Sequence, residues 1–455
     1  MIVILGAGLS GLSASYHIGH EKCLILEKQL HPFGHLRSDL RAGFTWDQGP
    51  HVSFTKHDYV RDLFVENVNG EFDEYEVKTT NYFQGHWIDH PAQSSLYQIP
   101  EPLRSRCLES FLESRSHSHK ESSPKNYKEW LEQALGPVFT ATFPAAYTRK
   151  YWTREAQDMT VDWVGKRVFL PKVEDVIAGS QGPLDRQTHY ITSVRYPRSG
   201  GYQSFVTKLT DGAHIRLGAE VVRIDLDKRK VWTAQGECFS YTHLINTLPL
   251  PLFVSLCIQA TDLAREAANQ LSCSQLLLVN ITAPHPTVRS ENWMYIYDED
   301  KLSTRINCTE KLTRRNAPDR NTGVQIEVYF SRHRPLTGTP HSITKKVISE
   351  LIEMELVENE AVKDGLVDTH VVYSPWANVI FDHDTKPSLN VIWSWLEKYG
   401  LKREVDDLHP LTDWDQKTTH SAGTIVMAGR FGQWKYFWTD DCVLRGKTLG
   451  ELAIS

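Results

Sequence analysis

A glycine-rich turn near the N-terminus carries the most specific chemical pattern in the sequence, and it reads Gly6-Ala7-Gly8-Leu9-Ser10-Gly11. The apolar run Ile2–Leu5 precedes this turn, helical spacing follows it, and a second apolar run ends at Glu27. Gly6 permits the tight turn, Gly8 lets the backbone approach a pyrophosphate, and Gly11 allows close packing of helix on strand. The helix N-terminus offers free N–H groups to phosphates, and Glu27, about 20 residues later, can accept both ribose hydroxyls. The pattern predicts a β-α-β unit that binds a dinucleotide.

Further glycine turns favour FAD over NAD as that dinucleotide. A second glycine-containing segment, residues 31–38, follows the acidic residue, and a third begins at Asp47. Such turns suit FAD, which is larger than NAD and whose pyrophosphate and isoalloxazine ring extend further along the protein. The hairpin at residues 221–247 and the turn Gly429-Arg430 are expected to form the remaining walls, and the sequence has no second G-x-G-x-x-G for a separate NAD(P)H domain. The candidate FAD-binding residues in these segments are Gly6, Gly8, Leu9, Ser10, Gly11, Glu27, Lys28, Gly34, His35, Leu36, Gly49, Val222, Gly429 and Arg430.

Composition excludes several other classes of protein. The chain has 455 residues, 40% of them hydrophobic and 23% charged, and a formal net charge of −6, so no overall basic field exists to hold nucleic acid. Its seven cysteines form no C-x-x-C pair, which argues against a disulfide framework or a zinc site. The longest charge-free apolar stretch, residues 244–258, is too short for a bilayer and contains two prolines. We expect a cytoplasmic protein without a metal, nucleic-acid or membrane partner, and its oligomeric state is open.

The pattern along the chain predicts an α/β fold with three lobes. Residues 58–154 show charged helical periods broken by prolines and no repeated strand pattern, whereas residues 215–247 alternate as antiparallel strands do. A buried strand is expected at residues 424–428 and a closing helix at residues 444–454. The predicted division is a discontinuous Rossmann-like FAD-binding domain (1–57, 198–262 and 418–455), a mainly helical substrate lobe (58–197) and a β-sheet substrate lobe (263–417).

Several longer segments, in their order and spacing, resemble one FAD-dependent superfamily. These segments are residues 81–87, 91–93, 150–152, 163–168, 195–201, 293–295 with Arg305, and 429–436. The superfamily holds amine oxidases, protoporphyrinogen oxidases and UDP-galactopyranose mutases, and the eukaryotic-type mutases are most similar. The resemblance places His51 at the flavin, where the mutases have a mobile histidine loop, and puts Asp440 and Asp441 in the last flavin-binding segment. It also implies a substrate site made of His90, Gln93, Trp152, Trp163, Arg167, Tyr295, Arg305 and Tyr436.

The residue types support these roles, although each has a plainer alternative. Arg167 and Arg305 come from distant parts of the chain and supply the forked donors that a diphosphate needs, but either can be a surface ion-pair member. Trp152 and Trp163 can be sugar platforms or core residues. His51 can contact the flavin or cap the Gly-Pro turn. Catalytic roles are expected for His51, Arg167 and Arg305.

Some positions depart from the mutase pattern. Pro50 stands where the mutases have the second glycine of Gly-Gly-His, and proline restricts the backbone there. His90 replaces an expected aromatic or amide residue in the base-binding segment. Leu312 and Asn378 lie where two further phosphate-binding tyrosines are expected. These departures leave the fold and FAD in place but do not specify UDP-galactose.

The leading functional hypothesis is a mutase that interconverts pyranose and furanose forms of a nucleotide-diphosphate sugar. The resemblance implies that N5 of reduced FAD attacks the anomeric carbon, with NAD(P)H or a reductant from solution restoring the reduced flavin. The alternative is an FAD-dependent oxidase or dehydrogenase of an amine or other small substrate. A third possibility is a binding protein that keeps FAD as a structural element.

Overall fold

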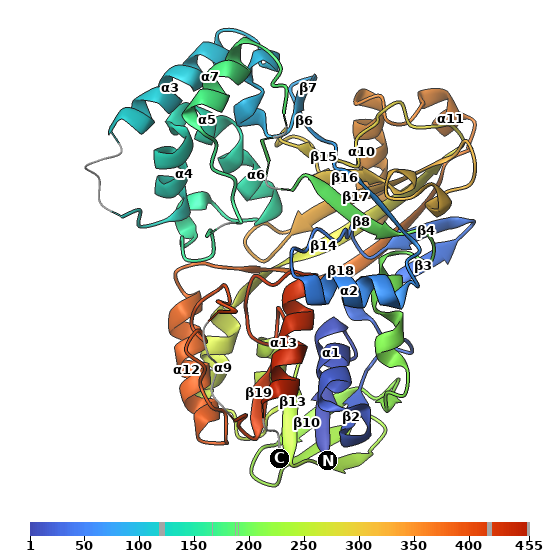
Figure 1. Ribbon diagram of the computed structural model, residues 1–455, viewed down its shortest axis with the longest axis vertical. Helices are drawn as coiled ribbons and strands as arrows, with labels where there is room; N and C mark the ends of the chain where they lie inside the picture. The colour runs from blue at the N-terminus through green and yellow to red at the C-terminus, as the bar shows by residue number, and fades with distance from the viewer. Residues whose placement is uncertain (118–122, 166, 187, 190, 416–420, 453–455) are drawn as a thin grey trace.

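A parallel five-stranded sheet forms the end of the molecule that holds both termini (Figure 1). The computed structural model describes residues 1–117, 123–165, 167–186, 188–189, 191–415 and 421–452. The strand order is β19-β13-β1-β2-β9, and all four pairings are parallel. The strands are β1 (Ile2–Leu5), β2 (Cys23–Leu26), β9 (Ile215–Arg216), β13 (His243–Asn246) and β19 (Ile425–Met427). Near-continuous burial of β1 and β13 is typical of a parallel sheet covered on both faces, so the α/β fold class is confirmed.

Two helices from opposite ends of the chain cross beside this sheet. They are α1 (Leu9–Ile18) and α13 (Thr439–Glu451), drawn blue and red in Figure 1. A Cβ added at Gly446 would lie 2.1 Å from Oγ of Ser13, so glycine permits this close crossing. The predicted β-α-β unit is confirmed. The closing helix begins at Thr439, earlier than expected, because the Asp441 carboxylate caps it by accepting the Trp438 N–H at 2.8 Å.

A three-stranded antiparallel sheet and three helices complete this end of the molecule. The strands are β10 (Val221–Asp225), β11 (Lys230–Thr233) and β12 (Cys238–Ser240), as the alternation at residues 215–247 predicts. The helices are α8 (Leu250–Leu256), α9 (Asp262–Gln270) and α12 (Thr385–Glu397). α9 and α12 pack against each other at the end of the molecule that holds the parallel sheet (Figure 1), although nearly all of both helices lies in the segment predicted for the β-sheet lobe. The domain bounds themselves stay predictions.

A seven-stranded sheet crosses the middle of the molecule in the order β18-β14-β17-β16-β15-β6-β7. Its strands are β6 (Thr79–Phe83), β7 (His86–Asp89), β14 (Ser272–Ala283), β15 (Trp293–Ile296), β16 (Arg305–Cys308), β17 (Thr322–Phe330) and β18 (Asp368–Ile380). Residues 58–154, where the sequence shows helical periods and no repeated strand pattern, also contain β6 and β7. β6 and β7 form a local antiparallel hairpin through Gln84 and Gly85, and β6 also pairs in parallel with β15, about 200 residues away, which joins the hairpin to the large sheet.

The two faces of this sheet differ in chemistry. Val324, Ile326 and Val328 of β17 pack in a core with Ile343 and Val347 of α10 (Pro340–Glu353), beside which lies α11 (Asn359–Lys363). The alternate residues of β17 point to the opposite face, which looks toward the parallel sheet. That second face therefore carries the side chains that are available to a site between the sheets.

The helical lobe stands above the seven-stranded sheet (Figure 1). Its helices are α3 (Leu103–His117), α4 (Tyr127–Leu135), α5 (Pro137–Thr142), α6 (Pro144–Tyr151) and α7 (Val173–Gln181). Helix α2 (Asp58–Asn67) and two antiparallel pairs connect the lobes: β3 (Ser38–Arg41) with β4 (Phe44–Asp47), and β5 (Phe72–Glu76) with β8 (Ser193–Pro197). Among the described residues, no helix combines the length and the apolar character that crossing a membrane requires.

Candidate functional site

One cavity of about 960 Å³ lies between the parallel sheet, the seven-stranded sheet and the helical lobe. It brings together nearly all of the residues that the sequence singled out. The predicted residues that line it are Gly6, Gly8, Leu9, Ser10, Glu27, Lys28, Gly34, His35, Leu36, Gly49, His51, His90, Gln93, Trp152, Trp163, Arg167, Val222, Tyr295, Arg305, Gly429, Arg430 and Tyr436. Gly11, Asp440 and Asp441 are not in the lining. Their predicted contacts with FAD stay predictions, and the structure gives Gly11 and Asp441 another role.

The glycine turn has the shape that a pyrophosphate requires. Gly8 is the N-cap of α1, and a Cβ added there would meet no atom within 4 Å, so its open side faces the cavity. Gly34 of the second turn approaches closely, because its added Cβ would lie 3.1 Å from Cα of Gly8. Gly11 packs behind the turn, where a Cβ would come within 2.0 Å of the Gly6 carbonyl oxygen. The open backbone and the helix N-terminus fit the diphosphate of a dinucleotide.

Glu27 follows β2 and closes the same end of the cavity. Its carboxylate accepts the N–H of Ala7 at 2.8 Å and that of Gln29 at 2.8 Å, so its orientation is fixed from two directions. The side chain is largely buried yet still lines the cavity, next to Lys28 and Val222. A carboxylate held in this way can accept a pair of ribose hydroxyls.

The loop after β4 forms the middle of the cavity. Its residue His51 stacks on Tyr202 at 5.5 Å between ring centroids, and Nδ1 contacts the Gly49 carbonyl oxygen at 2.8 Å. Burial, with a smaller contribution from the Arg430 guanidinium, lowers the pKa of His51 to about 3. His51 is therefore neutral near pH 7, and because a carbonyl can only accept, Nδ1–H donates and Nε2 is left as an acceptor. His51 thus both caps the Gly-Pro turn and lines the cavity.

Asp47, which was not among the predicted site residues, anchors this loop through its buried carboxylate. Its carboxylate accepts the Tyr202 N–H at 3.0 Å and the Tyr196 hydroxyl at 2.7 Å, and it also binds the Ser38 hydroxyl. Burial raises the pKa of Asp47 to about 6, although these hydrogen bonds act to lower it. The loop that carries His51 is therefore tied to a buried acid and not to the surface.

Arg167 reaches the cavity from the helical lobe. It does form an ion pair, as one reading of the sequence allows, but this pair is not at the surface. Its Nη2 donates to Asp441 Oδ2 at 2.8 Å, and its guanidinium carbon lies 3.4 Å from the centroid of the Trp438 ring. Yet the Arg167 side chain is only 14% exposed, and it lines the cavity. Asp441 therefore holds both the N-terminus of α13 and this arginine.

Arg305 lies on the cavity face of the seven-stranded sheet and is also paired. It stands directly opposite Glu327 in the β16–β17 register, and Nη2 donates to Oε1 at 2.8 Å while Nε donates to Oε2. Glu327 also accepts the Tyr329 hydroxyl at 3.2 Å. Glu327 was not among the residues predicted from the sequence. Its signal was present, since Gln325 and Glu327 alternate with the apolar residues of β17.

Aromatic side chains surround the two arginines. Tyr151 contacts Tyr329 at 4.8 Å and Tyr147 contacts Tyr295 at 5.5 Å between ring centroids, so four tyrosines gather near Arg305. Only Tyr295 was predicted among them. Trp152, Trp163 and Tyr436 form a second group, in which the ring centroids of Trp152 and Tyr436 are 5.3 Å apart. The two tryptophans belong to the core and also line the cavity.

Of the positions that depart from the mutase pattern, some line the cavity and one lies in the core outside it. Leu312 is buried in the core next to the parallel sheet, outside the cavity lining. Asn378 lines the cavity and accepts from Nη1 of Arg430 at 3.3 Å. His90 lines the cavity near Gln93, and its Nδ1 lies 3.1 Å from Asn81 Oδ1. Burial holds the pKa of His90 well below its usual range, so this histidine is neutral.

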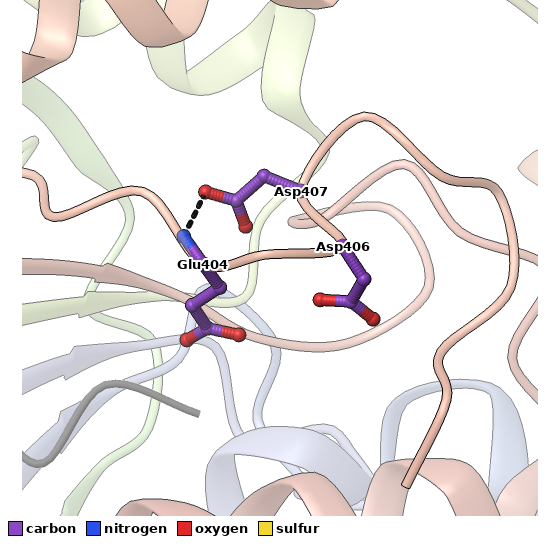
Figure 2. Close-up of side chains that lie close together, drawn as sticks. All are labelled: Glu404, Asp406 and Asp407. Atoms are coloured by element: carbon purple, nitrogen blue, oxygen red, sulfur yellow. Dashed lines mark hydrogen bonds between the residues drawn. The ribbon is translucent and has the colours of Figure 1, made fainter. Parts of the chain in front are cut away.

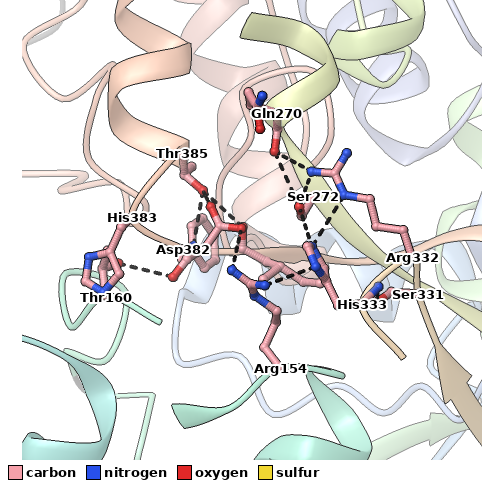
Figure 3. Close-up of polar contacts among 12 residues, drawn as sticks. Arg154, Thr160, Gln270, Ser272, Ser331, Arg332, His333, Asp382, His383 and Thr385 are labelled. Carbon is pink, nitrogen blue, oxygen red and sulfur yellow. Dashed lines mark hydrogen bonds and ion pairs between the residues drawn. The ribbon is translucent and has the colours of Figure 1, made fainter. Parts of the chain in front are cut away.

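A cluster of polar side chains joins the segment after α6 of the helical lobe to residues near the seven-stranded sheet (Figure 3). Arg154, just beyond α6, donates to His333 Nδ1 at 3.0 Å, and His333 Nε2 contacts the Ser272 hydroxyl at 3.0 Å. Arg154 also forms an ion pair of 3.6 Å with Asp382, which accepts the Thr385 hydroxyl at 2.9 Å. These contacts fix the segment that presents the α6 aromatic side chains to the cavity.

Three acids gather elsewhere in the described part of the chain, and their partners explain them without a metal (Figure 2). Glu404 forms two hydrogen bonds with Arg445, at 2.7 and 2.9 Å, and Asp406 pairs with Lys435 at 2.6 Å. Asp407 accepts the Glu404 N–H at 2.6 Å. Two buried cations thus pair with two of the three acids, the third accepts a backbone N–H, and the cluster lies outside the cavity lining.

Comparisons with known proteins identify the family and the fold of this chain. Residues 9–429 match a family model described as flavin-containing amine oxidoreductase. A crystal structure of reduced UDP-galactopyranose mutase has a TM-score of 0.85 at 21% identity, covering 99% of this chain and 94% of that chain. A fatty acid isomerase from P. acnes that produces CLA has a TM-score of 0.63 at 12% identity, covering 100% of this chain and 98% of that chain. A putrescine oxidase double mutant has a TM-score of 0.61 at 12% identity, covering 99% of this chain and 97% of that chain. These likenesses show the fold, and the family match shows that the chain belongs to the flavin-containing amine oxidoreductase family.

Proposed function

We propose that this protein is a flavin-dependent mutase that interconverts the pyranose and furanose forms of a nucleotide-diphosphate sugar. The observation that carries the proposal is the convergence of Arg167 and Arg305 on one cavity with the glycine turn. Two guanidinium groups beside several tyrosine hydroxyls suit a diphosphate leaving group. The likeness of the fold to reduced UDP-galactopyranose mutase adds support.

The chain's own residues would bind FAD and hold the substrate in place. The glycine turn, Glu27 and the loop of His51 fit the cofactor, and reduced FAD would supply a nucleophilic nitrogen at the anomeric carbon. Arg167 and Arg305 would keep the diphosphate within reach while the sugar rearranges, and Tyr295 would orient it. The surrounding aromatic rings exclude water, which would otherwise hydrolyse the glycosyl group.

A second candidate is an FAD-dependent oxidase or dehydrogenase of an amine or other small substrate. One observation favours it, namely that each arginine already has a carboxylate partner. Asp441 pairs with Arg167 and Glu327 pairs with Arg305, so the substrate end carries less positive charge than two free arginines would. A less charged substrate suits such a site.

Conditions and cellular context follow from the same proposal. The flavin would be kept reduced by NAD(P)H or by another reductant from solution. All seven cysteines are free thiols, which supports the proposal of a reducing compartment and hence the cytoplasm.

The decisive experiment compares the reduced and oxidised protein. The purified holoenzyme, either dithionite-reduced or air-oxidised, is incubated with UDP-, dTDP- and GDP-linked hexoses, and products are separated by chromatography with mass detection. We expect a new peak of unchanged mass with the reduced protein alone. Hydrogen peroxide formation and flavin bleaching with an amine, without any sugar isomer, would instead support the oxidase.

A further inference from the structure

The Glu327 carboxylate determines which edge of Arg305 faces the cavity. A guanidinium group has five N–H donors, and Glu327 occupies the one on Nε and one of the two on Nη2. The remaining Nη2 hydrogen and both Nη1 hydrogens donate to no described residue, and the Arg305 side chain lines the cavity. The end of the guanidinium that is formed by Nη1 and Nη2 is therefore the edge that a ligand meets.

Three contacts keep the pair in this arrangement. Arg305 and Glu327 are direct neighbours in the strand register, so their backbones cannot separate without breaking the sheet. The two parallel hydrogen bonds fix the rotation of the guanidinium plane. The Tyr329 hydroxyl holds Oε1 from the other side at 3.2 Å. Glu327 itself is 2% exposed, so water does not compete for it.

The pair is electrically different from the third arginine of the cavity. Arg430 is anchored by neutral acceptors, among them the carbonyl oxygens of Phe437 at 2.7 Å and Ala377 at 3.2 Å, and none of its partners among the described residues is a carboxylate. Arg305 is neutralised at close range by a buried carboxylate. A phosphate at the free edge of Arg305 is also close enough to Glu327 to be repelled by it.

We infer that Glu327 is a positioning residue that aims Arg305 at the diphosphate and at the same time limits how tightly the site holds it. The inference rests on the proposed function. A mutase must release the diphosphate from the anomeric carbon and take it back, so excessive affinity for the free diphosphate slows turnover. Glu327 holds the Arg305 guanidinium in a fixed orientation, which helps recapture the diphosphate, and compensates its charge, which helps release it.

This arrangement predicts opposite changes in binding and turnover. In Glu327→Gln, the amide still accepts from Arg305 but the repulsion of the phosphate is lost. We expect UDP to bind the oxidised holoenzyme about tenfold more tightly. The KM for the sugar nucleotide falls with it, and kcat falls about tenfold or more because Arg305 is less firmly aimed. Titration calorimetry with UDP and with inorganic pyrophosphate measures the binding change.

Two controls separate this effect from simple damage to the fold. Glu404→Gln removes the carboxylate from another buried two-point pair with arginine, outside the cavity lining, and should lower the melting temperature without changing the UDP affinity. In an Arg305→Gln background, Glu327→Gln should no longer tighten UDP binding, because the arginine that would be released is absent. FAD content, read from the flavin absorbance, confirms that each variant is a loaded holoenzyme.

The outcomes distinguish this inference from the proposed function. Wild-type protein that binds UDP while Glu327→Gln binds it equally or more weakly would overturn the role of Glu327 alone. If neither protein binds UDP or pyrophosphate, the mutase proposal fails and this inference fails with it. Tighter binding in Glu327→Gln that persists without Arg305 would also overturn it.

Discussion

The two ends of the cavity are built on different principles. At the cofactor end, the ligand is expected to meet backbone: an open glycine at position 8, a second glycine turn at position 34 and the N-terminus of α1. At the substrate end, it would meet side chains from four segments, among them Arg167 and Arg305, each held by a buried acid. The cofactor end thus depends on glycines that leave the backbone open, whereas the substrate end depends on arginine–carboxylate pairs.

This difference predicts how each end tolerates change. A backbone site fails as a unit when one Cβ intrudes, because the main chain cannot move aside. A site made of paired side chains loses function in steps, since each partner removed leaves the other in place.

The largest effect is expected at the glycine turn. Gly11→Ala would place Cβ 2.0 Å from the Gly6 carbonyl oxygen, so the turn and the fold around it should fail. Gly8→Ala points into open space, so the protein should fold normally but bind FAD about a hundredfold more weakly or worse, because the pyrophosphate is displaced. Flavin content after purification and apoprotein melting temperature measure the two effects. Gly182→Ala, at an extended residue with nothing within 4 Å, should change neither.

A contrary result here would break the comparison. If Gly8→Ala kept full FAD affinity, the cofactor end would not depend on an open backbone. If Gly11→Ala folded with normal stability, the close packing behind the turn would be unimportant.

The next largest effect is expected at Arg167. Arg167→Gln should keep FAD but lower kcat/KM for the sugar nucleotide about a hundredfold, because a charged donor to the diphosphate is lost. Asp441→Asn should cost about tenfold, since it leaves the arginine in place but less well held. Steady-state kinetics with dithionite-reduced enzyme measures both, and the exposed Arg216→Gln serves as control. Loss of flavin from Arg167→Gln would show that this residue contributes to FAD binding and not only to substrate binding.

A smaller effect is expected from pH at the loop between the two ends. His51 has its pKa lowered to about 3, so its contribution to stability is full above pH 6.5 and is lost as the pH falls toward 3. Asp47 has its pKa raised to about 6, so its contribution grows as the pH falls from 6 toward 3.8. The two contributions oppose each other between pH 6 and pH 4, each by at most about 1.4 kcal/mol per pH unit.

Chemical denaturation of wild type and variants separates these contributions. Relative to wild type, His51→Gln should become more stable as the pH falls from 6 to 4, and Asp47→Asn should become less stable. Equal pH dependence in all three proteins would mean that neither group keeps its shifted pKa in the folded state.

The smallest effect is expected at Tyr329. Tyr329→Phe removes the hydroxyl that donates to Glu327 at 3.2 Å but leaves the Arg305 pair intact, so KM should change only about two- to threefold. Tyr373→Phe on β18, an exposed tyrosine whose hydroxyl contacts Gln275, is the matched control. A loss as large as that of Arg167→Gln would mean that the substrate end does not fail in steps.

The same contrast explains what could be predicted from the sequence. The cofactor end follows from short-range spacing, because Gly6, Gly8 and Gly11 act on their own local backbone, and Glu27 follows at the end of the next strand. The β-α-β unit, the three-stranded antiparallel sheet and the last buried strand were confirmed for the same reason.

What the sequence could not reveal depends on partners far along the chain. Glu327 becomes visible as a site residue only when β16 pairs with β17, and the place of the β6–β7 hairpin in the large sheet depends on its pairing with β15. Asp47 was overlooked because its partners, Tyr196 and Tyr202, lie about 150 residues away. Leu312, expected near the phosphate, packs instead in the core beside the parallel sheet.

The strand order β19-β13-β1-β2-β9 also has a consequence for the order of synthesis. The segment of β13 is complete once residue 246 is made, and it can then pair with β1. Its other edge stays unpaired until β19 (residues 425–427) is made, and α1 stays uncovered until α13 is made. At about 5 to 20 residues per second, translation of the intervening segment takes roughly 10 to 40 s. During that time the nascent chain presents an open strand edge beside an uncovered apolar helix. The cofactor end, whose pattern appears first in the sequence, is therefore among the last parts to close, and it is the part most in need of protection from aggregation while the chain is made.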